Sequence, residues 1–331
     1  MAVIVLGSVR SCGTTTLAVA LAATWPTQRR VLVIEADPAG GTLAAASGWA
    51  PEPSLVSLAA AARRSNDPEA IWAHCHHLPG GAAVLAAPAG ADQARSAARM
   101  LAGLFDRLGE LDADVLVDVG RLDPTAPTPA VATGAERVVL VARPKLADLH
   151  AVAGFVEAEV GARLVADGRS GLVLVGDGPY PDGEITEALG VEVLGRLPWD
   201  PEAADLLAVL AASDRRLRLS PLVRAARSLS DALAADAIAT EVTPLAGPGL
   251  GPAEKVRAGG LLRARLLRPF RTSQLVDTTT VSPDVGITGP GTAGKGAVGD
   301  GVACNGAFSS NGASSNGAVG NGTAPGGEVT R

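Results

Sequence analysis

The chain has 331 residues, 47% of them hydrophobic, and can therefore bury a sizeable core in one large or two ordinary domains. Its formal net charge of -6 excludes overall attraction to nucleic acid and leaves only local basic patches for such contact. No run reaches the roughly 18 consecutive apolar residues of a membrane-spanning helix, and 3 scattered cysteines exclude a disulfide framework. We expect a globular protein in the cytoplasm.

Up to about Thr243, short apolar runs alternate with helical patterns rich in Ala and Leu, as in parallel βαβ units. The runs are continuously apolar, as in strands covered on both faces. They predict strands at residues 2–6, 30–36, 82–87, 114–119, 137–142, 171–176 and 191–197. Helical patterns lie at residues 14–25, 52–64, 91–111, 145–161, 182–190, 201–212 and 219–237. The expected fold is α/β: a doubly wound, mainly parallel seven-stranded sheet with helices on both faces.

After this domain, residues 1–243, the composition changes. Residues 244–271 are expected to form a linker with a short basic segment, LLRARLLRPFR, at 261–271. That segment resembles a membrane-surface helix, but Arg263 falls within the apolar arc and Pro269 ends the helix early, so we favour a mostly unstructured basic linker, with membrane contact as the alternative. Residues 272–331 hold an Asn-Gly-Ala-Ser tract with few large apolar groups, which predicts a disordered C-terminal tail.

The stretch GSVRSCGTTT, Gly7–Thr16, joins the first strand to the first helix, which is the place of a phosphate-binding loop. Such loops hold anions with converging backbone N–H groups and the helix N-terminus. Compared with GxxxxGK[ST], Ser8 replaces the first glycine and Thr14 the lysine, so an ordinary turn is the alternative. The candidate phosphate-binding residues are Arg10, Ser11, Gly13, Thr14, Thr15 and Thr16.

Three further segments bear on that choice: EADPAGGTLA at 35–44, VLVDVGRL at 115–122 and LGRLPWDPEAADLL at 194–207. With the loop, they resemble the MinD/ParA family of deviant-Walker P-loop ATPases, of the SIMIBI class, over about residues 1–240. Within that family the chain most resembles the lysine-lacking, actinobacterial-type relatives linked to Flp pilus assembly, which are CpaE- or TadZ-like. The resemblance implies the doubly wound fold and ATP and Mg as cofactors.

The resemblance also implies roles for residues at the strand ends. Asp37 would orient the attacking water and, with Thr15 and Asp118, hold Mg. At Gly120 the chain would run close to the γ-phosphate, while Pro198 and Asp200 would line the adenine pocket. The family's two loop lysines are absent, since Val9 and Thr14 occupy their positions, and Arg10 is the candidate replacement. Because each lost donor commonly costs about 10²–10³ in rate, hydrolysis is expected to be weak or absent.

Three hypotheses about function follow. The first is a positioning or assembly factor with a degenerate P-loop that serves a pilus or secretion machine. The second is an active chromosome- or plasmid-partitioning ATPase that dimerises on ATP and binds DNA weakly and non-specifically. The third is a nucleotide-free scaffold. The implied partners are a protein of a pilus, secretion or partition system, a second copy of the chain, DNA, or a membrane surface that the protein contacts peripherally.

Two local features have competing interpretations. Arginines cluster near the last helix and are either a DNA-contacting surface or a solvated helix face: Arg215, Arg216, Arg218, Arg224 and Arg227. The segment His74–His77 is rich in metal-ligating groups, but consecutive residues cannot all converge on one ion, and we expect no metal cluster. Cys12, in the loop, is either a reactive thiol or, as we favour, a small packed residue.

Overall fold

The computed structural model describes residues 2–26, 29–62, 64, 67–78, 81–103, 105–123, 128–209 and 215–242. The predicted linker at 244–271, its basic segment and the predicted tail at 272–331 lie outside the described residues. In the part of the chain that is described, no helix is both long and apolar enough to cross a bilayer.

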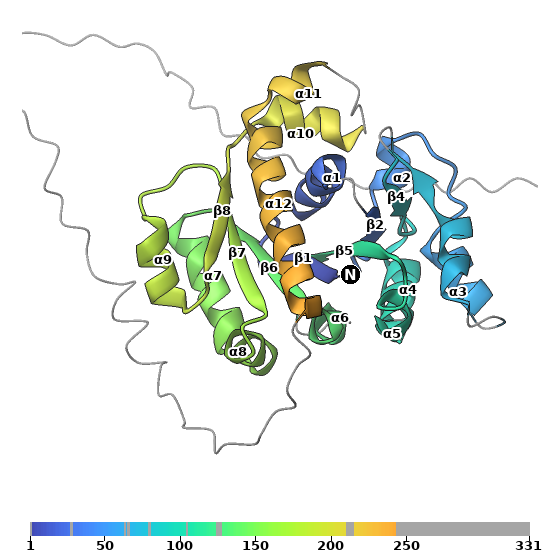
Figure 1. The fold of residues 1–331 in the computed structure, drawn as a ribbon, viewed down its shortest axis with the longest axis horizontal. Helices are drawn as coiled ribbons and strands as arrows, with labels where there is room; N and C mark the ends of the chain where they lie inside the picture. The colour runs from blue at the N-terminus through green and yellow to red at the C-terminus, as the bar shows by residue number, and fades with distance from the viewer. Residues whose placement is uncertain are drawn as a thin grey trace, which may run out of the picture. The chain divides into compact units, whose positions relative to one another are not determined.

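The described strands form one sheet with the order β3-β4-β2-β5-β1-β6-β7-β8 (Figure 1). Their bounds are β1 Val3–Ser8, β2 Arg30–Glu35, β3 His76–His77, β4 Ala83–Leu85, β5 Ala113–Arg121, β6 Arg137–Ala142, β7 Ser170–Val175 and β8 Val193–Leu197. All described pairs are parallel except β3 with β4. The predicted α/β fold is confirmed. The strand that the sequence did not predict, β3, is a two-residue antiparallel edge, too short to show a hydrophobic period.

Helices cover both faces of this sheet, and strand residues of opposite parity supply the two cores. Val3 and Val5 face one core and Ile4 and Leu6 the other. On the second face lie α1 Thr14–Thr24, α2 Leu43–Ala46, α10 Pro201–Ala208, α11 Arg215–Leu219 and α12 Pro221–Val242. On the first lie α3 Leu55–Ala62, α4 Ala91–Ala102, α5 Phe105–Leu108, α6 Thr128–Gly134, α7 Leu146–Glu157, α8 Glu159–Ala166 and α9 Asp182–Leu189. A 3₁₀ helix, Pro68–His74, follows α3.

Two helical patterns of the sequence are each divided in the structure. The pattern at 145–161 breaks at Ala158, whose backbone is extended, so that α8 folds back on α7. Gly161 allows this approach, because a Cβ there would lie 2.0 Å from the carbonyl oxygen of Phe155. The pattern at 91–111 ends as a helix at Gly103, after which α5 begins at Phe105. The break at Ala158 accompanies packing of α8 against α7, which hydrophobic periodicity alone does not report.

The histidine-rich segment at β3 makes separate structural contacts. His74 Nδ1 lies 2.7 Å from Ser57 Oγ, whereas His76 Nε2 lies 2.9 Å from the carbonyl oxygen of Pro53. Cys75 is buried, which raises the pKa of its thiol to about 12. Within the described ranges, no group of three His, Cys, Asp or Glu side chains is arranged to hold a metal ion.

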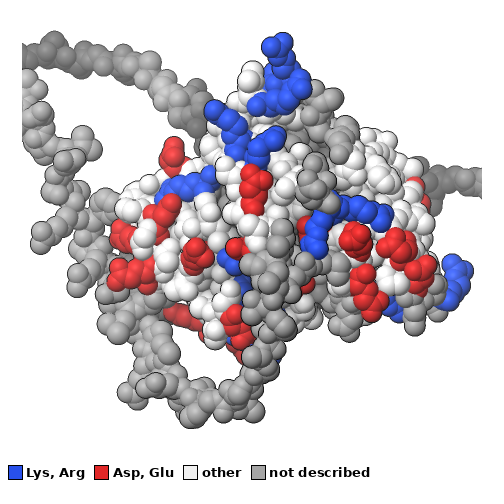
Figure 2. Space-filling view, viewed as in Figure 1, with Lys and Arg blue, Asp and Glu red and all other residues white. Residues whose placement is uncertain are grey.

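Charged side chains are unevenly spread over the surface. On the face drawn in Figure 2, basic side chains gather at the top of the view, where Figure 1 places α10 and α11. The arginines predicted near the last helix are all exposed there or along the start of α12: Arg215, Arg216, Arg218, Arg224 and Arg227. Arg216 forms a 2.9 Å ion pair with Glu202 of α10.

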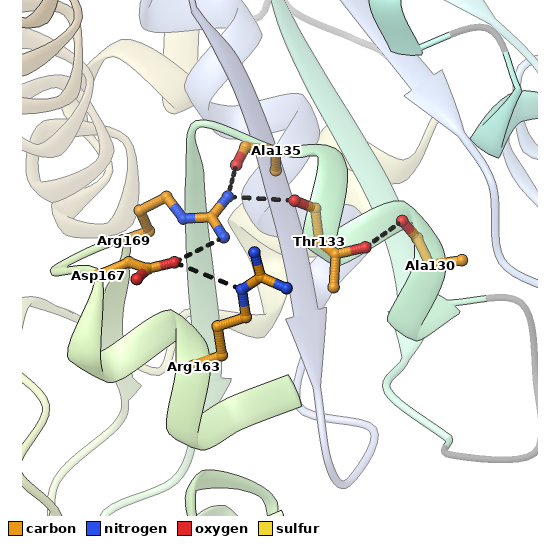
Figure 3. A network of polar contacts seen from close by, with 6 residues as sticks. All are labelled: Ala130, Thr133, Ala135, Arg163, Asp167 and Arg169. Carbon is orange, nitrogen blue, oxygen red and sulfur yellow. Dashed lines mark hydrogen bonds and ion pairs between the residues drawn. The ribbon is translucent and has the colours of Figure 1, made fainter. Parts of the chain in front are cut away.

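An arginine network fastens the end of α6 to the start of β7 (Figure 3). Arg169 NH1 donates to the carbonyl oxygens of Ala135 at 2.7 Å and Thr133 at 3.1 Å, and its NH2 donates to Asp167 at 3.1 Å. A cation here is favourable because the last carbonyls of a helix have no intrahelical partner. Arg163 reaches the same carboxylate only at 3.9 Å.

The network predicts unequal effects for its two arginines. Arg169→Met should lower the free energy of unfolding by about 1–2 kcal/mol, because it removes charged hydrogen bonds to backbone carbonyls. Arg163→Met, in which an exposed ion pair is lost, should change it by less than about 0.5 kcal/mol. Urea denaturation of both variants measures the difference, and equal losses would contradict the assignment.

Candidate functional site

The loop Gly7–Thr16 runs from the carboxyl end of β1 into α1. Gly13 is the N-cap residue, with φ of 92°, a left-handed conformation that favours glycine. No side chain caps the helix in the described structure, and its first turn carries no acidic residue. The first N–H groups of α1 are therefore available to an external acceptor, and the helix dipole favours an anion there.

A cavity of about 460 Å³ opens in front of this loop. It is lined by loop residues and by side chains from the ends of β2 and β5. Most predicted phosphate-site residues lie on its wall: Ser11, Gly13, Thr14, Thr15, Thr16, Asp37 and Gly120. Asp118 lies beneath them, fully buried, where its carboxylate accepts a 2.5 Å hydrogen bond from Thr15 Oγ1. The structure thus brings together segments separated by about a hundred residues in sequence.

A second cavity, of about 350 Å³, shares part of the loop with the first and extends toward the end of β8. Pro198 and Asp200, predicted to line a base pocket, both lie on its wall, as do Trp199 and Arg143. Asp200 caps α10, accepting from the backbone N–H of Ala203 at 3.0 Å and from Ser220 Oγ at 2.7 Å. Its carboxylate therefore shapes the wall of the cavity, while the indole of Trp199 is 69% exposed.

The structure does not bring Arg10 to the phosphate cavity. Its guanidinium Nε lies 3.8 Å from Asp148 Oδ1, and Arg10 lines neither cavity. Arg143 contacts the same carboxylate at 3.0 Å. Cys12, a loop residue near Arg143 and Asp148, is buried, which raises the pKa of its thiol, as expected of a packed residue rather than a reactive one.

Three carboxylates from neighbouring strand ends gather at the base of the cavity. Burial raises the pKa of Asp118 to about 7, and repulsion from Glu35 and Asp37 adds to the shift, although hydrogen bonds from Thr15 and the Gly120 N–H oppose it. Burial also raises the pKa of Asp37, against the effects of the Ala39 N–H and of the nearby Arg121. The hydrogen bonds and charges of the protein therefore do not offset the effect of burial on either carboxyl.

Glu35 has a different function from its neighbour Asp37. Its Oε1 accepts from the backbone N–H groups of Thr42 at 2.7 Å and Leu43 at 3.1 Å, and its Oε2 from that of Ala87 at 3.1 Å. Burial raises the pKa of this carboxyl as well. The glutamate thus anchors the segment that follows β2, whereas Asp37 faces the cavity.

Sequence reasoning missed two arginines, Arg95 and Arg121, that line the phosphate cavity. Arg121 NH2 donates to Ser11 Oγ at 3.1 Å. The available signal was its place as the last residue of a strand whose carboxyl end faces the loop, in the GRL sequence that follows Asp118.

The residues present fit a magnesium ion with phosphates. Thr15, Asp37 and Asp118 offer hydroxyl and carboxylate oxygens, the ligands that Mg²⁺ prefers. Their clustered negative charge, with raised pKa values, is what a divalent cation would neutralise. The adjoining cavity supplies the backbone N–H groups and the hydroxyls for phosphate oxygens.

No protein-family model matches this chain, and no curated protein does. Solved structures do resemble it. A ParA family ATPase from Chlorobium tepidum TLS is 17% identical, with a TM-score of 0.57, over 69% of this chain and 98% of that one. The MinC:MinD cell division protein complex of Aquifex aeolicus contains a chain that is 14% identical, with a TM-score of 0.53, over 71% of this chain and 96% of that one. MinD from Pyrococcus horikoshii OT3, complexed with Mg-ADP, is 18% identical, with a TM-score of 0.52, over 73% and 98%.

These similarities define the class of fold. The chain has the fold of MinD- and ParA-type P-loop ATPases, and between 69% and 73% of it corresponds to nearly the whole length of each of those chains.

Proposed function

We propose that the protein is a MinD/ParA-like positioning or assembly factor that binds Mg-ATP at a degenerate P-loop and hydrolyses it slowly or not at all. The observation that carries the proposal is the hydroxyl–carboxylate group formed by Thr15, Asp37 and Asp118 beneath a loop whose lysine positions hold Val9 and Thr14. The Mg-ADP complex of the Pyrococcus horikoshii protein supports the choice of ligand.

In this proposal the chain's residues act mainly by binding. The N–H groups at the start of α1 and the hydroxyls of Thr15 and Thr16 hold the phosphates, while the cavity at Pro198 and Trp199 takes the base. Mg²⁺ would be held by Thr15, Asp37 and Asp118 and would neutralise phosphate charge. Asp37, which lies on the cavity wall, would orient the attacking water. Since both loop lysines are absent, charge that builds on the phosphates during cleavage is poorly stabilised.

The proposed cellular role is to position or assemble a pilus or secretion machine from the cytoplasm, with a protein partner and as a homodimer. The MinC:MinD complex supports a protein partner, since MinD is seen there bound to a second protein.

A partitioning ATPase that binds DNA is the second candidate, favoured by the five exposed arginines on α11 and α12. It requires salt-sensitive DNA binding that depends on nucleotide. A nucleotide-independent DNA affinity would count against it.

Calorimetric titration with Mg-ATP, followed by steady-state hydrolysis, tests the first proposal. We expect binding, with turnover about 10² or more below that of a lysine-bearing family member. Turnover equal to such an enzyme and abolished by Asp37→Ala would show an active ATPase instead. Absence of binding would leave the scaffold hypothesis.

A further inference from the structure

Arg121 is the cation that the structure presents to the phosphate loop, and its orientation depends on an irregularity in β5. Between β1 and β5, Leu6 pairs with Asp118 and Ser8 with Arg121, so two steps along β1 match three along β5. The extra residue lies between Asp118 and Arg121, where Gly120 has a left-handed φ of 58°. Such a bulge shifts the alternation of side chains by one and re-aims those that follow.

The core confirms that shift. Before the bulge, the side chains of Val117 and Val119 belong to one core, and that of Leu116 belongs to the core on the other face, which α1 covers. Because side chains alternate along a strand, Asp118 lies on the same face as Leu116. After it, Leu122 lies in the core of Val117 and Val119, although regular alternation would place it opposite them. The side chain of Arg121 consequently lies on the same face as Asp118 and the loop, where its NH2 donates a hydrogen bond to Ser11 Oγ at 3.1 Å.

Among the described residues, two other arginines near the loop have ion-pair partners of their own. Arg10 pairs with Asp148, outside the cavity. Arg95 lines the cavity but forms an ion pair with Asp92, one turn earlier on α4. Arg121 is exposed and lines the cavity beside Asp37, where its charge opposes the rise that burial causes in the pKa of that carboxyl.

From this placement we infer that Arg121 binds the terminal phosphates of the nucleotide and supplies, from the end of β5, positive charge that the loop itself lacks. The inference rests on the proposed function of the site. A guanidinium donates two parallel N–H bonds to phosphate oxygens, so its geometry differs from that of a lysine while its charge is equivalent. Thr14, in the lysine position, is buried and brings no charge to the cavity wall that it lines.

The test is calorimetric titration of the full chain with Mg-ATP and with AMP, for the wild type, Arg121→Gln and the matched control Arg10→Gln. Loss of a charged hydrogen bond predicts that Arg121→Gln weakens Mg-ATP binding about 10- to 150-fold. AMP lacks the β- and γ-phosphates, so its affinity for Arg121→Gln should equal its affinity for the wild type. Arg10→Gln should bind both ligands as the wild type does, and Arg121→Lys should recover part of the loss.

Unchanged Mg-ATP binding by Arg121→Gln would overturn the inference and leave the proposed function standing. Equal weakening of ATP and AMP would also overturn it, because the contact would then not be with terminal phosphates. A similar loss of Mg-ATP affinity in Arg10→Gln would also overturn the inference, since a general effect of removing positive charge would then explain the loss in both variants. If the wild type binds neither ligand, the proposed function fails as well.

Discussion

Replacing Asp118 with Asn should stabilise the protein at pH 8 by about 2–4 kcal/mol when Mg²⁺ and nucleotide are absent. In the folded protein the pKa of Asp118 is about 7, above its ordinary 3.8, chiefly because the carboxyl is buried. The folded state therefore retains a proton that the unfolded state has released. Stability falls as the pH rises from about 4 to about 7, and Asn, which does not ionise, removes this loss.

The measurement is urea denaturation in EDTA at pH 5 and pH 8. The wild type should be more stable at pH 5, and Asp118→Asn should show a smaller difference between the two. A residual difference is expected from Glu35 and Asp37, whose pKa values are also raised by burial. The same loss of stability from pH 5 to pH 8 in both proteins would contradict the assignment.

Asp114 provides a matched control, because it is buried on the same strand but is differently partnered. Its carboxylate accepts from the N–H of Ala2 at 3.0 Å, from Trp25 Nε1 at 3.0 Å and from Arg29 at 3.5 Å. Asp114→Asn should lower stability by about 1–3 kcal/mol, since all three of its partners are N–H donors and an amide can accept them on its oxygen only. At Asp118 the partner of one oxygen is the hydroxyl of Thr15, which can also accept from an Asn side chain, while the amide oxygen keeps the bond from the Gly120 N–H. A loss of stability in Asp114→Asn and a gain in Asp118→Asn would distinguish a structural carboxylate, Asp114, from a carboxylate that holds a cation, Asp118.

Gly120→Ala should lower the free energy of unfolding by about 2–4 kcal/mol and displace Asp37 from the cavity wall. The backbone there has φ of 58°, which costs an alanine about 1–2 kcal/mol. In addition, the new Cβ would lie 2.0 Å from Asp37 Oδ2 and 2.2 Å from its Cγ, so the whole carboxyl must move. Such overpacking adds about 1–3 kcal/mol.

Gly48→Ala separates these two contributions. Gly48 has a similar φ of 65°, but nothing lies within 4 Å of a Cβ placed there, so only the backbone cost applies. Asp37→Gly combined with Gly120→Ala should recover the steric part, which a double-mutant cycle measures as a coupling of about 1–3 kcal/mol. Equal losses for Gly48→Ala and Gly120→Ala would refute the contact with Asp37.

Much of the fold was predictable because its determinants are local. A strand buried on both faces favours an apolar run, so β1 and β6 are visible directly in the sequence, and β5 is visible although Asp114 and Asp118 interrupt its run. The predictions at Asp37 and Asp118 needed one further step, that parallel strands end at a common edge. Where helices divide or an edge strand has two residues, as at Ala158 and His76–His77, the determinants are tertiary contacts and the sequence pattern was insufficient.

For the candidate site, the sequence by itself determined the loop between β1 and α1, the absence of both lysines and the carboxylates that face them. Only the tertiary structure decided where the charges point. It turned Arg10 toward Asp148 and tied Glu35 to three backbone N–H groups. It also turned Arg121 toward Ser11. The physical reason is that one extra residue in β5 reverses the alternation of side chains, a change that depends on pairing with β1 and not on the residues of β5 alone.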